Sequence, residues 1–258
     1  GVASGYGALA NNTTGNFNVA YGGQALAANT TPSYNTAIGY SAMKSNTTGE
    51  KSTGVGSLAL YSNTTGFRNS AFGHSSLNSN TTGNNNAANG YMALTGNTTG
   101  VNNTAVGSLS GATNSTGNSN TSIGYSALRF NTGSNNTASG VYSLEDNTTG
   151  YNNTATGYAA SQANTTGFQN VVNGAYALFT NTTGTNNIAT GYQSLYANTT
   201  GASNVAVGTS SLRSNTTGSN SVAIGHEASY SNTTGVSNTA VGALALRADV
   251  SIGNNTAL

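Results

Sequence analysis

The chain has 258 residues, of which only 4% are charged, and its formal net charge is +1. So small a net charge provides no electrostatic basis for binding to nucleic acid or to an anionic membrane surface. The absence of cysteine excludes disulfides and thiolate metal sites, and no apolar run is long enough to span a bilayer, so we expect no membrane insertion in this segment.

A single motif, Asn-Thr-Thr-Gly, recurs along the chain at a constant step, as at Asn12, Asn29 and Asn46. A fixed step of this size indicates one structural unit stacked many times. The unit reads Thr-Ala-Val-Gly-x-x-Ala-Leu-x-x-Asn-Thr-Thr-Gly-x-x-Asn, and about fifteen copies run from Val2 to Asn255. We number its positions 1 to 17, so that Thr36 occupies position 1 and Asn46 position 11 of the third copy.

Positions 1 to 3 predict a short strand. Segments such as Thr36-Ala37-Ile38 and Val205-Ala206-Val207 place a small residue between two β-branched ones, which is typical of a strand with one buried face. Position 4 is glycine in every copy, from Gly5 to Gly242. We therefore expect a corner there that requires a positive φ or a close backbone approach.

Positions 7 and 8 are Ala or Ser followed mostly by Leu, and they predict a second short strand. Together with the alanine of position 2, they describe a narrow and tightly packed interior. Positions 3, 5, 6 and 9 vary freely, which indicates that they face solvent or a partner. A helix is disfavoured because glycine recurs twice in each unit, at a cost of about 1 kcal/mol each.

The Asn-Thr-Thr-Gly motif itself is expected to form an outer turn. One copy, Asn131-Thr132-Gly133, lacks a threonine, and Pro32 replaces the glycine of another. A deletion inside a paired strand would turn its side chains to the opposite face, whereas an outer turn tolerates it. In the last copy Asp249-Val250-Ser251-Ile252 replaces the motif, and its alternation suggests a change of structure.

The predicted fold is an all-β, parallel β-solenoid, similar to a β-roll, with about 17 residues per coil and about fifteen coils. We expect residues 1–258 to form a single repeat domain. Neither end has the polar cap that solenoids need, which predicts a fragment of a longer fibre. Each coil buries only one leucine and a few alanines, so we also expect lateral self-association to supplement the core.

The segment from Ser221 to Ala228, Ser-Val-Ala-Ile-Gly-His-Glu-Ala, resembles the head repeat of YadA-like trimeric autotransporter adhesins. Thr104-Ala105-Val106-Gly107 and Thr121-Ser122-Ile123-Gly124 are similar to it, and the Asn-Thr-Thr-Gly form resembles repeat shafts of bacterial and phage tail-fibre-like proteins. The resemblance implies a left-handed parallel β-roll and a homotrimer outside the cell. The longer coil of this chain departs from the adhesin repeat.

Catalytic chemistry is not indicated by the sequence. His74 and His226 lie nine copies apart, and Glu145 and Asp146, the adjacent acids, would point in opposite directions on a strand. No set of nucleophile, base and acid can be assembled from these residues. We expect no enzyme activity, no metal site and no cofactor.

The asparagines of position 11 form the first candidate site. Stacked side chains could hydrogen-bond from coil to coil as a ladder, with the threonines and the glycine completing the turn. The same triplets are acceptor sequons for N-linked sugar, and the threonine hydroxyls are an alternative attachment point. The candidate residues are Asn12, Asn29, Asn46, Asn63, Asn80, Asn97, Asn114, Asn147, Asn164, Asn181, Asn198, Asn215 and Asn232.

Position 9 supplies a second candidate, a surface stripe. On successive coils it carries aromatic and basic side chains that would alternate in cation–π contact. Such a stripe could bind a glycan or a host-surface ligand, or it could pack between chains or neighbouring coils. Its residues are Phe179, Tyr196, Arg213, Tyr230 and Arg247.

The sequence therefore favours an extracellular structural fibre or an adhesin shaft or head segment, located at a cell surface or in a virion fibre. Its mechanism would be mechanical, a stiff rod that holds a tip or a multivalent surface away from its base. One alternative is a phage or virus tail-fibre shaft. Another is an ice-binding solenoid, which the consecutive threonines of the turn disfavour because their side chains diverge.

Overall fold

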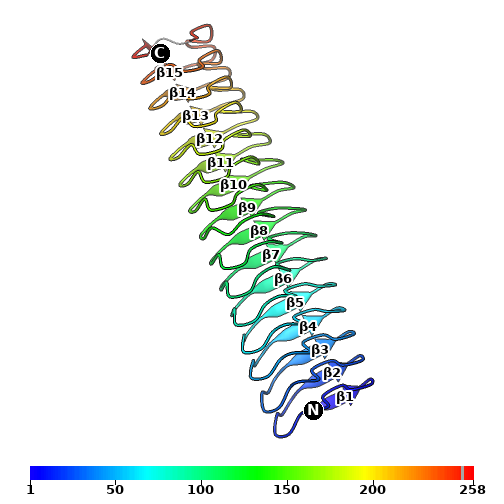
Figure 1. The fold of residues 1–258 in the computed structure, drawn as a ribbon. Helices are drawn as coiled ribbons and strands as arrows, with labels where there is room; N and C mark the ends of the chain where they lie inside the picture. Colours follow the sequence, from blue (N-terminus) through cyan, green and yellow to red (C-terminus); the bar gives the residue numbers. More distant parts are fainter. Residues whose placement is uncertain (251–252) are drawn as a thin grey trace. The chain divides into compact units, whose positions relative to one another are not determined.

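The computed structural model describes residues 1–250 and 253–258 and shows an all-β, parallel β-solenoid. The predicted fold class, with about 17 residues in each of about fifteen coils, is confirmed. The chain forms two units, residues 1–132 and 133–258, whose boundary falls in the shortened Asn131-Thr132-Gly133 turn. Within each unit the strands follow one another in chain order (Figure 1).

Each coil contributes one strand, and within each unit this strand pairs in parallel with the strand of the next coil, as where Ala20 faces Ala37. In unit 1 these strands are β1 (Val2–Ser4), β2 (Val19–Tyr21), β3 (Thr36–Ile38), β4 (Thr53–Val55), β5 (Ser70–Phe72), β6 (Ala87–Asn89), β7 (Thr104–Val106) and β8 (Thr121–Ile123). In unit 2 they are β9 (Thr137–Ser139), β10 (Thr154–Thr156), β11 (Val171–Asn173), β12 (Ile188–Thr190), β13 (Val205–Val207), β14 (Val222–Ile224), β15 (Thr239–Val241) and β16 (Thr256–Ala257).

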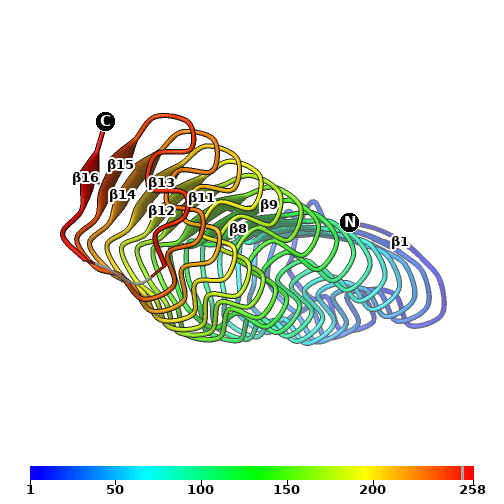
Figure 2. The same cartoon turned by 90° about the horizontal axis from the view of Figure 1, so that it is seen from above.

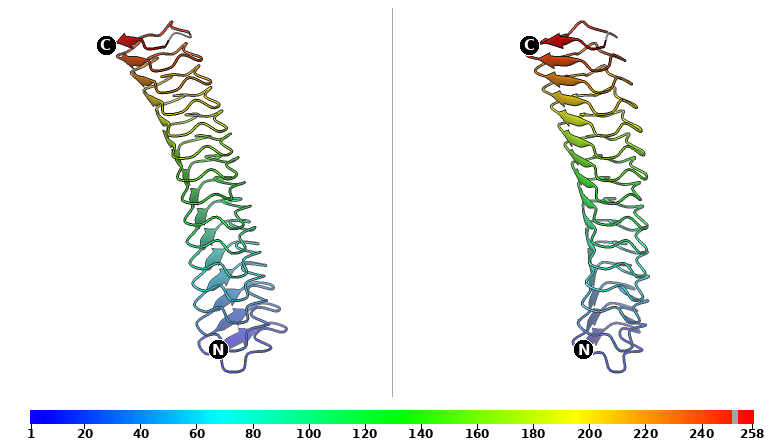
Figure 3. Two further views of the ribbon diagram at one scale, coloured as in Figure 1. Left: turned by 60° about the vertical axis from the view of Figure 1, so that its left-hand side comes forward. Right: turned by 90° about the vertical axis from the view of Figure 1, so that its left-hand side faces the viewer.

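The strands form because their alternation matches a sheet that is buried on one face only. In β7 the central Ala105 is buried, whereas Thr104 and Val106 are exposed on either side of it. The strands of each unit lie in a row along one side of their coils (Figure 3). The rest of each coil consists of turns, which Figure 2 shows as loops that extend to the side of the strands in unit 2.

The glycine of position 4 ends each strand at a corner that no other residue fits. Gly39 has a φ of 133°, and a Cβ placed on it would lie 2.5 Å from the carbonyl oxygen of Gly56 in the next coil. Both predicted reasons for the glycine, a positive φ and a close backbone approach, therefore apply together.

The predicted second strand at positions 7 and 8 is wrong. Leu60, at position 8, has a φ of 52°, which is left-handed rather than extended. The local hydrogen bonds are those of turns, from Ala59 N–H to the Gly56 carbonyl at 3.2 Å and from Asn63 N–H to the Leu60 carbonyl at 3.1 Å. Leu60 N–H still binds the next coil, at the Ser76 carbonyl, so its donor is satisfied without a strand.

The interior is as narrow as the sequence predicts. Leucines of position 8, such as Leu60 and Leu77, are fully buried, and so are the alanines of positions 2 and 7. At one coil Gly54 takes the place of the alanine, and a Cβ there would lie 3.0 Å from Cγ of Met43, which replaces the leucine of the preceding coil. The larger and the smaller residue thus compensate one another in volume.

The Asn-Thr-Thr-Gly motif is a turn, as expected, but only its threonines lie outside. In the third copy Thr47 and Thr48 are exposed, whereas Asn46 and Gly49 are buried. In the last copy, the Val250 carbonyl accepts the Thr233 N–H at 2.8 Å, as a threonine carbonyl does elsewhere. The expected change of structure at Asp249-Val250-Ser251-Ile252 otherwise falls on residues 251 and 252, outside the described residues.

A search of the described residues found no helix with the length and apolar character needed to cross a membrane.

Candidate functional site

The asparagines of position 11 form a hydrogen-bonded ladder along the inside of the turns. Asn63 donates through Nδ2 to Oδ1 of Asn46 in the preceding coil at 2.8 Å and to the Gly66 carbonyl of its own turn at 2.9 Å. In unit 2 Asn181 makes the same bonds to Asn164 and Gly184, at 2.7 and 3.0 Å. Each amide nitrogen thereby uses both of its protons.

This ladder bears on the two interpretations of the sequons. Asn12 is half-buried, and the other candidate asparagines are at most 1% exposed. The buried members are Asn29, Asn46, Asn63, Asn80, Asn97, Asn114, Asn147, Asn164, Asn181, Asn198, Asn215 and Asn232. A sugar on one of these amides would have to replace a ladder bond and displace the neighbouring coil. In the folded coil these asparagines therefore form the ladder and are not accessible for glycosylation.

The ladder is interrupted at one place in unit 1. The Oδ1 atom of Asn114 is buried and accepts no hydrogen bond. The next turn in the chain is Asn131-Thr132-Gly133, which is one residue short. We attribute the unused acceptor to that deletion, because in the full-length turns the corresponding Oδ1 accepts from the following asparagine.

A second column of asparagines, at position 17, ties the side chains to the backbone. Asn69 donates to the Gly83 carbonyl of the next coil at 2.7 Å and accepts from the backbone N–H of Asn86 at 2.9 Å. The Gly83 carbonyl also accepts from Asn80 of the first column at 3.0 Å. The two columns therefore converge on the same glycine carbonyls, and the turn is held from both sides.

The two threonines of each turn have different roles. The hydroxyl of the first threonine donates to the carbonyl of its counterpart in the next coil, as from Thr182 to Thr199 at 3.1 Å. The second threonine, such as Thr183, is exposed. If sugar is attached to a threonine hydroxyl, this second position is the accessible one.

The predicted stripe of position 9 is assembled in unit 2. Phe179 and Tyr196 stack with ring centroids 5.3 Å apart and planes inclined by 9°. The Arg213 guanidinium lies 5.2 Å from the Tyr196 ring centre and 5.6 Å from that of Tyr230, and Arg247 lies 5.3 Å from Tyr230. All five candidates thus form one continuous row.

Polar residues of position 6 hold the arginines of the stripe in place. Arg213 donates from Nε to Oε1 of Gln193 at 3.0 Å and from a terminal nitrogen to the Tyr230 hydroxyl at 3.1 Å. Arg247 donates to Oε2 of Glu227 at 2.5 Å. That hydrogen bond lowers the pKa of Glu227, and the charges of Arg247 and His226 add to the effect. In the sequence, each arginine has its partner 20 residues earlier, that is, one coil back and three positions earlier. Comparison of residues at a single repeat position does not reveal this spacing.

The stripe also continues into a cluster of tyrosines that the sequence analysis did not connect with it. Tyr176 makes edge contacts with Tyr158, Tyr192 and Phe179, with ring centroids 5.3, 6.3 and 5.6 Å apart. Burial, followed by the charge and hydrogen bonding of Tyr158, raises the pKa of Tyr176. Positions 5, 6 and 9 therefore form one aromatic surface in unit 2.

The two histidines lie in different units, His74 in unit 1 and His226 in unit 2. His74 stacks on Tyr91 with centroids 5.6 Å apart, and His226 lies 3.9 Å from Glu227. Within the described ranges, no group of three or more histidine, cysteine, aspartate or glutamate side chains could hold a metal ion.

No protein-family model matches the chain, and no curated protein sequence matches it.

Proposed function

We propose that the chain is a segment of an extracellular structural fibre or adhesin shaft. One observation carries the proposal: the same set of hydrogen bonds links each coil to the next through the asparagine and threonine side chains of the turn. In a solenoid, stability is the sum of such neighbour contacts. A segment built in this way resists bending and local unfolding along its length, which is what a shaft requires.

The outward face of the strands supports self-association into a homotrimer or a filament. Positions 1 and 3 carry no charged residue in any copy. Large apolar side chains are exposed there, among them Ile38, Phe72, Val106 and Ile123 in unit 1 and Val171, Ile188, Ile224 and Val241 in unit 2. An uncharged face with exposed β-branched residues is suited to packing against another sheet face of the same kind.

This association is tested by placing a charge on the face. Ile188→Lys should shift the purified chain from an oligomer to a monomer in analytical ultracentrifugation. The control is Thr183→Lys, which puts the same charge on an exposed turn residue. A chain that is monomeric without any substitution would contradict the proposed oligomer, and so would an oligomer that survives Ile188→Lys.

The shaft function itself is tested by locating the protein. Gold-labelled antibody against residues 1–258 should decorate filamentous projections on the intact producing cell or on a virus particle. Labelling of a cell surface favours the adhesin or fibre, and labelling of a virion favours the tail-fibre shaft. Label that appears only inside permeabilised cells would overturn both.

A second candidate function, ice binding, is favoured by threonines that the strands direct outward. In β10, Thr154 and Thr156 are both exposed on either side of the buried Ala155. These strand threonines differ from the consecutive threonines of the turn, whose side chains diverge. Thermal hysteresis that is lost in Thr154→Lys and retained in Thr183→Lys would support ice binding, and its absence from the unsubstituted chain would exclude it.

A further inference from the structure

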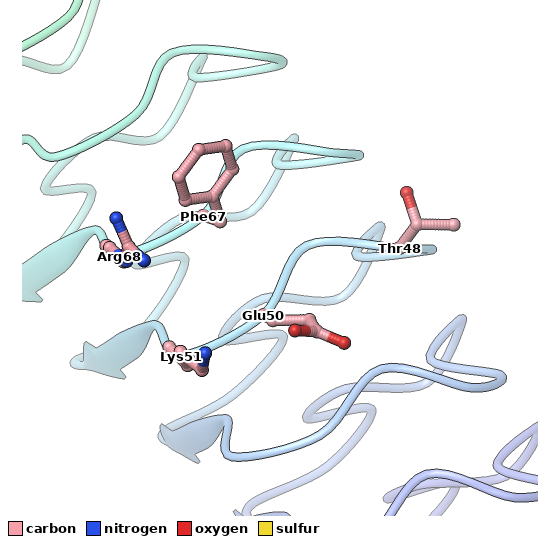
Figure 4. A pocket seen from close by; sticks show the side chains of 5 residues that line it. All are labelled: Thr48, Glu50, Lys51, Phe67 and Arg68. Atoms are coloured by element: carbon pink, nitrogen blue, oxygen red, sulfur yellow. The ribbon is translucent and has the colours of Figure 1, made fainter.

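We propose that a hollow in unit 1 binds an acidic sugar residue, such as a uronic acid, through its carboxylate and its ring. The hollow has a volume of about 200 Å³ and is lined by Thr48, Glu50, Lys51, Phe67 and Arg68. These residues come from two successive coils, with Lys51 and Arg68 at corresponding places and Phe67 on the coil next to that of Glu50 (Figure 4). The proposed binding does not depend on the fibre function. Only the natural source of the sugar, outside the cell, rests on it.

Charge is concentrated at this hollow in a chain that otherwise has very little. Three of the chain's 6 basic and 5 acidic residues line it. Among the described residues, neither Lys51 nor Arg68 forms an ion pair with Glu50 or with any other carboxylate. Two exposed cations without a carboxylate partner are therefore available to an anionic ligand.

The backbone sets the spacing of the two cations. Lys51 and Arg68 both occupy position 16, with left-handed φ values of 55° and 53°. Because coils of a parallel solenoid repeat at about 4.8 Å, their side chains leave the backbone one coil apart and in the same direction. That spacing suits a carboxylate that bridges an ammonium group and a guanidinium group, each through a charge-assisted hydrogen bond.

The remaining residues select a sugar over a simple anion. The Phe67 side chain is 38% exposed and offers an apolar surface, while the Arg68 guanidinium lies 5.4 Å from the centre of that ring. The apolar C–H face of a pyranose packs well on an aromatic ring. The Glu50 carboxylate accepts hydrogen bonds from hydroxyl groups and repels a second anionic group, and the Thr48 hydroxyl can donate or accept.

The test measures binding of glucuronic acid to the purified full chain by isothermal titration calorimetry or saturation-transfer NMR. We expect glucuronic acid to bind and uncharged glucose to bind at least about tenfold more weakly, since glucose lacks the carboxylate that both cations would contact. Sodium sulfate, which supplies the charge without the ring, should compete only weakly.

Substitutions localise the binding. Arg68→Gln and Phe67→Ala should each weaken glucuronic acid binding about tenfold or more. Arg68→Gln should do so without changing the thermal midpoint, because this side chain is exposed. Lys44→Gln, a basic residue of unit 1 that does not line the hollow, is the matched control and should bind like the unsubstituted chain. The proposal is overturned by undetectable glucuronic acid binding, by glucose or sulfate binding equally well, or by binding that Arg68→Gln leaves unchanged.

This assay needs no assumption about where the protein is located. Binding in solution together with antibody label confined to the cell interior would refute the fibre function and leave the site intact. Antibody-labelled fibres whose protein does not bind glucuronic acid would refute the sugar site and support the fibre function.

Discussion

At the residue scale, the unusual feature of this chain is that ordinary side chains adopt left-handed backbone conformations in every coil. They recur at positions 6, 8 and 16, as at Gln193, Leu195 and Ser203. For a residue other than glycine, this conformation costs roughly 1–2 kcal/mol. The coil accepts the cost because each of these N–H groups, including that of Ser203 to the Thr185 carbonyl at 3.0 Å, binds a neighbouring coil.

Relief of this strain is the first prediction. Ser203 is exposed, with a φ of 57°, so Ser203→Gly should raise the free energy of unfolding by about 0.5–1 kcal/mol. Ser203→Val should lower it, because a β-branched residue suits this conformation least. Urea denaturation of the three proteins provides the measurement. A Ser203→Gly protein less stable than the parent would show that the turn is not left-handed.

The second prediction concerns the asparagine ladder. Asn63→Ala removes the donor to Asn46 and to the Gly66 carbonyl and the acceptor for Asn80. All three partner residues are buried. Unpaired buried polar groups of this kind cost about 1–3 kcal/mol each before the coil relaxes, so we expect a loss of about 2–4 kcal/mol in the free energy of unfolding. The control is Thr65→Ala in the same turn, where the exposed side chain should change stability by less than about 0.5 kcal/mol. Equal effects at Asn63 and Thr65 would contradict the ladder.

At the scale of the element, the sequence predicts the strand and the glycine corner but not the turns between them. Alanine between Thr36 and Ile38 and the glycine at Gly39 each have a local physical meaning, burial in one case and a positive φ in the other. The leucine of position 8 has no such signal, because leucine is rarely left-handed and its burial suits a strand equally well. Its conformation is set by bonds that form only in the folded coil, such as those from the Leu60 N–H to the Ser76 carbonyl of the next coil and from the Asn63 N–H to the Leu60 carbonyl.

The stripe shows the same limit. Phe179, Tyr196 and Arg213 could be placed in one row from the repeat step alone. Their partners Gln193 and Glu227 could not, because they sit three positions earlier and one coil back, and reach the arginines only through side-chain length. Pairings of this kind depend on the direction in which the side chains leave the coil, and this direction cannot be predicted from the repeat pattern.

The third prediction is a pH dependence of the stripe. The hydrogen bond from Arg247 lowers the pKa of Glu227 in the folded chain below its unfolded value. The stabilising contribution is therefore present above the unfolded pKa and is lost as the pH falls through the folded pKa. Glu227→Gln should have a lower thermal midpoint than the parent at pH 7, and the difference should vanish in acid. Glu50→Gln, an exposed carboxylate outside any ion pair among the described residues, should show no such pattern.

At the scale of the whole molecule, the chain is a repeat in which every coil depends on its neighbours, so a single missing residue has consequences beyond its own turn. The shortened Asn131-Thr132-Gly133 turn coincides with the boundary between the two units and with the unused Oδ1 of Asn114. The sequence located this irregularity and indicated that a turn could absorb it. It did not indicate that a ladder acceptor would be left buried and unpaired.

Repair of this turn is the fourth prediction. Insertion of one threonine between Asn131 and Thr132 restores the full motif and should return a partner to Oδ1 of Asn114. We expect a gain of about 1 kcal/mol in the free energy of unfolding, the value of one satisfied buried hydrogen bond. Insertion of a threonine after Thr65, in a turn that is already complete, is the control and should not stabilise the chain. A loss of stability at the repaired turn would mean that the deletion is accommodated by a different register.

Stacking of each coil on the next, with equivalent repeat positions in register, can be tested by disulfide cross-linking, because the chain has no cysteine of its own. In unit 2, Val205 of β13 pairs directly with Val222 of β14. Adjacent strands lie about 4.8 Å apart, within the Cα separation that a disulfide accepts. Val205→Cys with Val222→Cys should form an intramolecular disulfide on mild oxidation, whereas Val205→Cys with Thr239→Cys, two coils apart, should not. Failure of the first pair to cross-link, or equal cross-linking of both pairs, would contradict the stacked solenoid.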